Sequence, residues 1–229
     1  MPVDRVEECS LEDEFTSLRL GMAGVTDDGS QLKLDVLVLL DGVSRPDAEE
    51  ALSSVDVIYE PLKIDVALRY RRLPPVPGSR IRDVDLIQIS KDAVGGQRPK
   101  GVDVVYTLTS REIFGGFGDS TAGRADCIGG IKYPHRAFAV GEHGPPSEEA
   151  PPFTYREAYS AKIAAHEIGH LLGAAHEYSN CAEGSDTDPT RDIFGICTVM
   201  FNDVSLIGMK FSTLEGSVIR GYASDYVVP

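Results

Sequence analysis

The chain has 229 residues, with 22 basic and 36 acidic side chains and a formal net charge of −14. Hydrophobic residues make up 42%, which excludes a disordered chain, and the longest aliphatic run (residues 36–40) is far too short to cross a bilayer. The acidic balance argues against nucleic acid as a partner, because binding phosphates requires a basic surface. The first residues are polar and acidic, so no signal peptide is recognisable in this sequence.

The first half of the chain alternates between strand and helix patterns. Residues 32–40 alternate at first and then become continuously apolar, which predicts a strand buried on both faces. Apolar residues at helical spacing follow Pro46 and predict one helix that reaches Ile58. Residues 62–68 alternate again and predict a second strand, so this part of the chain indicates a right-handed βαβ unit.

The middle of the chain predicts further strands. Residues 84–89 fit either a helix or a strand, and the sequence leaves this choice open. Residues 102–108 are rich in β-branched side chains and predict a third core strand. Residues 136–140 predict another short strand, which we expect at an edge of the sheet.

The clearest helix is predicted for residues 154–172. Thr154 and Glu157 fit a capping box, in which each side chain accepts a hydrogen bond from the backbone N–H of the other residue. Gly173 supplies the residue type that most often ends a helix.

Three histidines at the end of this helix carry the chemistry. His166 and His170 are four residues apart, so a helix brings both imidazoles to one face, where they can bind one metal ion. Gly173 permits a sharp turn, after which His176 can come back towards the other two rings. Three protein ligands leave the fourth tetrahedral position to water, which is the arrangement of catalytic zinc.

Glu167 directly follows the first histidine of the set. It projects about 100° around the helix axis from that residue, so it can lie beside the metal without being a ligand. A bound zinc ion lowers the pKa of its water towards 7 and polarises a carbonyl group. We expect Glu167 to be the general base, accepting the proton of that water and returning it to the leaving amine. The predicted reaction is therefore the hydrolysis of peptide bonds without a covalent intermediate.

The pattern His166-Glu167-x-x-His170-x-x-Gly173-x-x-His176 resembles the zinc-binding signature of the metzincins. Metzincins also carry a methionine turn beneath the zinc, and residues 197–201 look like that turn, with Met200 as a hydrophobic floor. Within the metzincins the chain looks most like the adamalysin (reprolysin) branch. The resemblance implies a zinc-dependent endopeptidase with polypeptide substrates. It also implies that an extended substrate pairs with the edge strand expected near residues 136–140.

The resemblance implies an α/β fold. A twisted, mostly parallel sheet with an antiparallel edge strand and helices is expected, together with a small irregular C-terminal subdomain. A single metalloprotease domain is expected over residues 31–229, divided into an upper subdomain (31–173) and a lower subdomain with the methionine turn (174–229). Residues 1–30 are expected to be either an N-terminal extension or the first part of the same domain.

The four cysteines leave their pairing open. Cys181 and Cys197 flank the loop before the methionine turn, and a bridge between them would add about 3 kcal/mol in the chain-entropy model. Cys9 and Cys127 would then form a second bridge or remain free thiols, and Cys9 could instead cap the zinc as a zymogen thiol. Paired cysteines indicate a location outside the reducing cytosol, so a secreted or extracytoplasmic enzyme is expected.

Two alternative functions remain open. A non-catalytic zinc-containing module could bind peptides with the same histidines, but it would not need the base Glu167. Another zinc hydrolase with the His-Glu-x-x-His pattern, such as a deformylase-like enzyme, would take its third ligand elsewhere and leave His176 unexplained. A calcium ion could bind the acidic loop through oxygen ligands, although solvated carboxylates explain it more simply. The loop residues concerned are Asp186, Asp188 and Asp192.

Overall fold

The computed structural model describes residue 9 and residues 29–74, 77–116, 121–144, 155–176, 197–201 and 209–227. The strands are β1 (Leu32–Asp41), β2 (Ile64–Arg72), β3 (Arg80–Arg82), β4 (Val104–Thr109), β5 (Glu112–Phe114), β6 (Gly123–Ala125) and β7 (Phe138–Glu142). The helices are α2 (Arg45–Ala51), α3 (Val55–Tyr59), α4 (Asp83–Val94), α5 (Tyr155–Leu171) and α6 (Thr213–Tyr226), with 3₁₀ turns at Glu60–Leu62 and Gly130–Lys132.

The main sheet has five strands in the order β2-β1-β4-β7-β6. Strands β2, β1, β4 and β7 run parallel, and β6 pairs antiparallel with β7. Strands β3 and β5 form a separate parallel pair. The predicted fold class, a mostly parallel sheet with an antiparallel edge strand, is therefore confirmed.

The prediction that the strand near residues 136–140 lies at the sheet edge is wrong. This strand is β7, which lies between β4 and β6, and all five of its residues are buried. The edge strand on this side of the sheet is the three-residue strand β6, and β2 forms the opposite edge. The physical reason is burial on both faces of the sheet, which favours the apolar and small side chains of residues 138–141 at an interior position.

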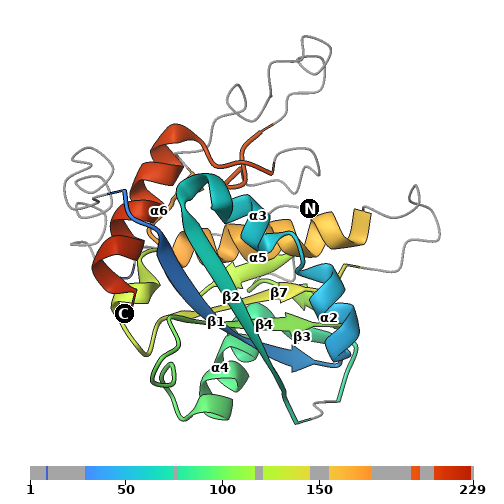
Figure 1. Ribbon diagram of the computed structural model, residues 1–229. Helices are drawn as coiled ribbons and strands as arrows, with labels where there is room; N and C mark the ends of the chain where they lie inside the picture. The colour runs from blue at the N-terminus through green and yellow to red at the C-terminus, as the bar shows by residue number, and fades with distance from the viewer. Residues whose placement is uncertain are drawn as a thin grey trace.

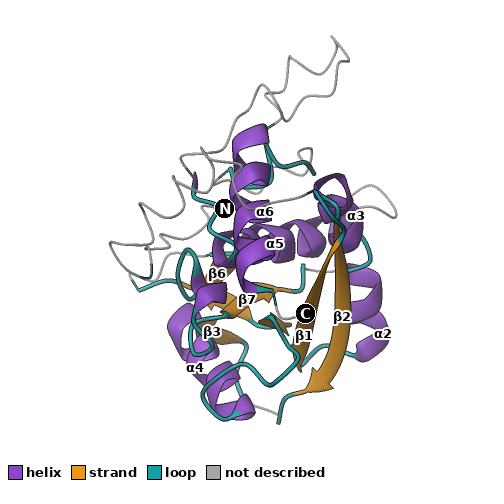
Figure 2. Cartoon of the chain, turned by 60° about the vertical axis from the view of Figure 1, so that its left-hand side comes forward, coloured by secondary structure: helices purple, strands orange, loops and turns teal. Residues whose placement is uncertain are grey.

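The helices cover the two faces of the sheet unequally (Figures 1 and 2). Helix α4 alone packs on one face, whereas α2, α3 and α5 lie on the other and α6 packs at the end of that layer. Alternating side chains of β4 serve both layers: Tyr106 and Leu108 join the larger apolar core beneath α5, and Val105 joins the smaller core beneath α4. The long helix with the predicted histidines is thus enclosed between the sheet and other helices.

Two helix predictions need correction or completion. The single helix expected from Pro46 to Ile58 is two short helices, α2 and α3, separated by a turn at residues 52–54. Ser53 and Ser54 in this turn are weak helix formers, which explains the break. The undecided segment 84–89 belongs to helix α4.

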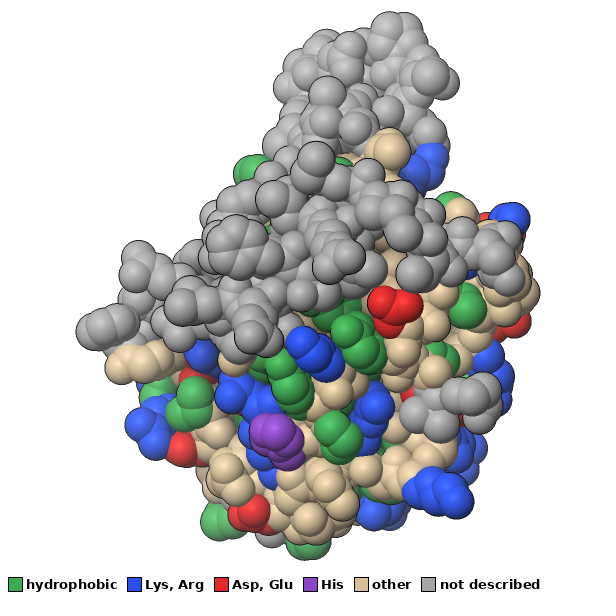
Figure 3. All heavy atoms as spheres, turned by 90° about the vertical axis from the view of Figure 1, so that its left-hand side faces the viewer, with side chains coloured by type: hydrophobic (Ala, Val, Ile, Leu, Met, Phe, Trp, Pro, Cys, Tyr) green, Lys and Arg blue, Asp and Glu red, His purple; other side chains and the backbone are tan. Residues whose placement is uncertain are grey.

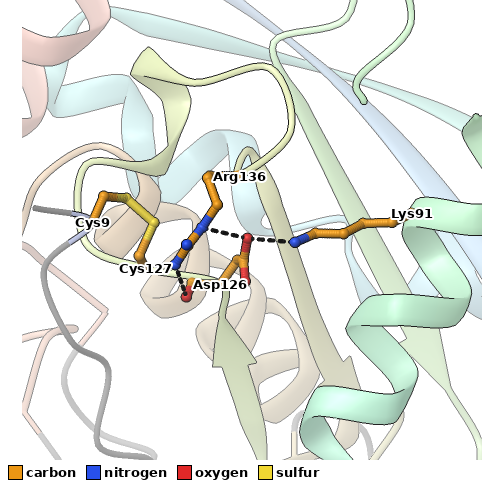
Figure 4. Close-up of a disulfide and its surroundings, with 5 residues drawn as sticks. All are labelled: Cys9, Lys91, Asp126, Cys127 and Arg136. Atoms are coloured by element: carbon orange, nitrogen blue, oxygen red, sulfur yellow. Dashed lines mark hydrogen bonds and ion pairs between the residues drawn. A yellow bond between two sulfur atoms is a disulfide. The ribbon is translucent and has the colours of Figure 1, made fainter. Parts of the chain in front are cut away.

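One disulfide bond joins Cys9 to Cys127 just after β6 (Figure 4). The neighbouring Asp126 forms ion pairs with Lys91 of α4 and with Arg136, and the pair with Lys91 joins the same loop to α4. Of the alternatives left open for Cys9 and Cys127, the structure has the bridge between them, so the alternatives of two free thiols and of a zymogen thiol are wrong. Cys197 is also disulfide-bonded, but its expected partner Cys181 lies outside the described residues.

The described part of the chain carries as many basic as acidic residues, so the acidic excess falls in the remaining sequence. Figure 3 shows Lys and Arg side chains spread over one face of this part, among neutral side chains and some acidic ones. The acidic composition is therefore not a property of the sheet and its helices. Among the described helices, none is both long enough and apolar enough to cross a membrane.

Candidate metal centre

Helix α5 carries the first two histidines through the middle of the molecule. Its residues 159–171 are all buried, because the sheet lies on one side and other helices on the opposite side. The hydroxyl of Tyr59 in α3 donates a hydrogen bond of 2.9 Å to the carbonyl of Ala165, one residue before His166. This buried contact fixes the helix backbone at the level of the site. The predicted capping residues Thr154 and Glu157 lie outside the part whose side chains are described.

The helix ends in the predicted turn at Gly173, which has a φ of +84°. The N–H of Gly173 donates to the carbonyl of His170 at 2.9 Å, and the N–H of Ala174 donates to the carbonyl of Gly169 at 3.0 Å. These two bonds form a Schellman motif, which requires a left-handed residue after the helix. A Cβ atom on Gly173 would also lie 2.4 Å from the ring of Tyr222 in α6. Only glycine therefore fits both the backbone angle and the space.

The turn brings the three histidines together. The Nε2 atoms of His166, His170 and His176 lie 3.1 Å from one another in all three pairs. A tetrahedral zinc ion bound at 2.0–2.1 Å would hold its ligand atoms about 3.3–3.4 Å apart, which agrees with this triangle to within a few tenths of an ångström. Within the described ranges these residues form the one set of histidine, cysteine or acidic side chains that could hold a metal ion.

Backbone carbonyls orient two of the three rings. The Nδ1 of His166 lies 2.7 Å from the carbonyl oxygen of Val199, and the Nδ1 of His170 lies 2.7 Å from that of Ala174. A carbonyl oxygen can only accept, so each Nδ1 carries the hydrogen and each Nε2 keeps its lone pair for a cation. Burial, more than the neighbouring rings, lowers the pKa of His166 to about 3 and that of His170 well below its usual value. Both rings are therefore neutral, as a metal ligand must be.

Met200 lies directly beneath the two helical ligands. The side chain is fully buried, and its sulfur lies 2.7 Å from the position that a Cβ atom on Gly169 would occupy. Gly169 thus allows the thioether to pack against the helix backbone between His166 and His170. The N–H of Phe201 donates to the carbonyl of Thr198 at 3.2 Å, which closes the turn. The methionine turn that the resemblance implied is present, and Met200 forms a hydrophobic floor.

The carboxylate of Glu167 faces the edge strand of the sheet. Glu167 is fully buried, and its Oε1 lies 2.8 Å from the position that a Cβ atom on Gly123 of β6 would occupy. Gly123 pairs with Gly141 of β7, and the hydroxyl of Tyr106 occupies the space left at Gly141. Burial first, and the Glu167 carboxylate second, raise the pKa of Tyr106 well above its usual value. Sequence reasoning missed this pair of glycines, which lets α5 approach the sheet edge.

Several predicted features fall outside the described residues. These are Cys181 and the candidate calcium ligands Asp186, Asp188 and Asp192. Of the predicted site residues, the structure therefore describes the three histidines, Glu167 and Met200.

Comparisons with known proteins agree with this geometry. A family model described as metallo-peptidase family M12B, reprolysin-like, matches residues 47–177, which is more than half of the chain. No curated protein sequence matches the chain.

Two solved structures share the fold. Metalloproteinase-II from Bacteroides fragilis superposes with a TM-score of 0.52 at 19% identity, covering 79% of this chain and 49% of the other. Archaemetzincin from Methanopyrus kandleri superposes with a TM-score of 0.57 at 16% identity, covering 83% of this chain and 95% of the other. The chain thus spans about half the length of the Bacteroides protein. From the family match, the histidine triangle and the metzincin-like fold, we conclude that the chain belongs to the reprolysin-like M12B family of metallopeptidases.

Proposed function

We propose that the chain is a zinc-dependent endopeptidase in which His166, His170 and His176 bind the metal and Glu167 is the general base. One observation carries the proposal: three Nε2 atoms lie 3.1 Å apart, and two of the rings donate their Nδ1–H groups to backbone carbonyls. Rings held in this tautomer present lone pairs to a common point. A purely structural histidine cluster does not require this arrangement.

The protein groups have separate tasks in this proposal. Zinc, when bound, supplies a Lewis acid that polarises the scissile carbonyl and acidifies water. The three histidines hold the ion without neutralising its charge, since all are expected to be neutral ligands. Glu167 accepts a proton from the attacking water and later donates it to the leaving amine. Its buried carboxylate lies on the helix position beside His166 and against β6, where it can reach a substrate bound at that edge.

The substrate is proposed to bind as an extended polypeptide along β6. In the described sheet this strand pairs only with β7, so its other edge can accept a further strand. Gly123 of β6 lies against the Glu167 carboxylate, so a chain paired with β6 would bring its peptide bonds close to the proposed base. This proposal replaces the binding site expected at residues 136–140, which belong to the interior of the sheet.

The decisive experiment measures zinc content and proteolysis in parallel. The purified chain is expected to bind one zinc ion and to cleave casein or a peptide library at internal bonds. Glu167→Gln should keep the zinc and lose about 100-fold or more of the turnover, because general base catalysis is removed. Glu112→Gln is a matched control, since Glu112 is exposed on β5 and pairs with Arg80. This control should retain both properties.

The same experiment separates the alternatives. A chain that binds zinc and peptides but cleaves neither substrate would be a non-catalytic binding module. A His176→Ala protein with zinc affinity equal to that of the parent would favour a deformylase-like ligand set. The 3.1 Å separation of the His176 Nε2 from both other rings argues against that set.

A secreted or extracytoplasmic location is also proposed. The support is the Cys9–Cys127 disulfide and the bonded state of Cys197, because such bonds persist in oxidising compartments. Thiol labelling of the protein taken directly from its native source tests this. Labelling of Cys9 or Cys127 in the native protein would contradict the proposal.

A further inference from the structure

Helix α6 begins with a capping box that is buried beneath the metal centre. The Oγ of Ser212 accepts a hydrogen bond from the N–H of Glu215 at 3.1 Å, and the Oε2 of Glu215 accepts one from the N–H of Ser212 at 2.6 Å. Capping boxes usually satisfy only the first turn of their own helix. Here Glu215 is fully buried, and its second carboxylate oxygen lies towards another part of the chain.

That second oxygen binds the methionine turn. The hydroxyl of Thr198 donates a hydrogen bond of 2.7 Å to the Oε1 of Glu215, and Thr198 is fully buried as well. A buried carboxylate is stable only when its lone pairs are satisfied, so both ends of this contact are constrained. The contact joins segments 17 residues apart.

The next residue, Val199, is the partner of the first histidine. Its carbonyl oxygen lies 2.7 Å from the Nδ1 of His166, and its N–H donates to the carbonyl of Lys210 at 2.9 Å. The orientation of the Val199 carbonyl therefore depends on the turn that Thr198 begins. One hydrogen bond joins Glu215 to Thr198, and another joins Val199 to the ring of His166. The peptide backbone between residues 198 and 199 connects the two.

We propose that Glu215 and Thr198 are positioning residues of the metal site: the Glu215 carboxylate fixes the methionine turn so that the Val199 carbonyl holds His166 in its metal-binding tautomer. The proposal rests on the zinc site proposed above. A helix cap alone would need only one carboxylate oxygen, and a buried threonine alone would need no acidic partner. The contact between them makes the affinity for zinc dependent on α6, which contributes no ligand to the triangle.

The test compares two identical substitutions at fully buried threonines. Thr198→Val removes the hydroxyl that reaches Glu215. Thr107→Val removes a hydroxyl that lies 2.6 Å from the Oγ of Ser90, between β4 and α4, on the sheet face opposite α5. Both variants lose a buried side-chain hydrogen bond, so both should lose some thermal stability as zinc-free proteins. Only Thr198→Val should bind zinc less tightly.

Zinc affinity is measured on the full chain by competition with a chromophoric chelator at fixed pH. Thr198→Val is expected to bind zinc about tenfold more weakly than the parent, at the lower end of the effect of removing a partner that orients a ligand. Thr198→Ser, which keeps the hydroxyl, should restore the parent affinity. Thr107→Val should bind zinc as the parent does.

A second variant covers the case in which Thr198→Val does not fold. Glu215→Asp shortens the side chain by one methylene, so the carboxylate can no longer hold both the N–H of Ser212 and the hydroxyl of Thr198 at their present distances. It should show the same weaker zinc affinity. Parent-like affinity in Thr198→Val or in Glu215→Asp would overturn the proposal. A parent protein that binds no zinc would instead overturn the proposed function, so the two failures are distinguishable.

Discussion

The Nδ1 of His170 donates a hydrogen bond of 2.7 Å to the carbonyl of Ala174, four residues further along the chain. The turn at Gly173 makes this contact possible, because it reverses the chain immediately after α5. The same turn directs His176 towards the other two rings. One glycine therefore ends the helix, orients the second ligand and brings in the third.

Gly173→Ala is expected to weaken zinc binding at least tenfold and to lower the free energy of unfolding by about 2 kcal/mol or more. The alanine would be strained at a φ of +84°, and its Cβ would lie 2.4 Å from the Tyr222 ring. Chelator competition and urea denaturation of the zinc-free protein measure the two effects.

Gly95→Ala is the control for backbone strain alone. Gly95 ends α4 with a φ of +85°, and a Cβ atom there meets nothing within 4 Å. This variant should lose about 1 kcal/mol of stability and no zinc affinity. Equal zinc affinity in both variants would show that Gly173 matters only for the helix end.

The metal site could be predicted from sequence because its determinants are local. His166, His170, Gly173 and His176 lie within a single helix end, where spacing and the freedom of glycine fix the geometry. The backbone contacts that orient the histidine rings could not be predicted from the sequence. The Val199 carbonyl comes from a separate segment, and no local pattern specifies which backbone group meets a given ring.

The order of strands could not be predicted in the same way. A strand's position in a sheet depends on pairing between distant segments, and three-residue β6 carries too little pattern to be recognised. Helix α6 is a different case: Ser212 and Glu215 form a visible capping-box pattern, and sequence analysis overlooked it. Even with α6 predicted, the bond from Glu215 to Thr198 is tertiary and needed the structure.

Gly123→Ala is expected to lower proteolytic turnover at least tenfold while zinc content remains unchanged. Its Cβ would lie 2.8 Å from the Oε1 of Glu167 and 2.9 Å from the carbonyl of Val140, so the carboxylate or the strand must move. Gly116→Ala is the control, because a Cβ at Gly116 meets nothing within 4 Å. Turnover of a quenched peptide and zinc content check both variants, and unchanged turnover in Gly123→Ala would contradict the proposed position of the base.

Replacing both Cys9 and Cys127 by alanine is expected to lower the free energy of unfolding by about 4–5 kcal/mol. The two residues are 118 positions apart, and the chain-entropy model assigns a stabilisation of this size to such a long loop. Zinc affinity should not change, because Asp126 still pairs with Lys91 and Arg136 beside the loop. Substitution tests this bond separately from the disulfide of Cys197, which a reductant would also break. A loss below about 1 kcal/mol would show that other contacts hold residue 9.

Glu142 should make stability depend on pH. Its carboxylate at the end of β7 is buried and accepts a hydrogen bond from the N–H of Ile113. Burial nevertheless raises its pKa to about 7, so the folded protein favours the protonated form more than the unfolded chain does. The stabilisation is complete below the unfolded pKa and is lost as pH rises towards 7. By linkage the loss is about 3 kcal/mol.

Glu142→Gln removes this dependence, because an amide can accept from Ile113 but does not titrate. Urea denaturation at pH 4.5 and pH 8 gives the difference in free energy of unfolding for each protein. Because His166 and His170 are buried with lowered pKa values, they impose the opposite slope. Both proteins share that slope, so it cancels when the parent is compared with the variant. The parent should lose about 3 kcal/mol more than the variant between the two pH values, and equal losses would mean that Glu142 ionises in the folded protein at its ordinary pKa.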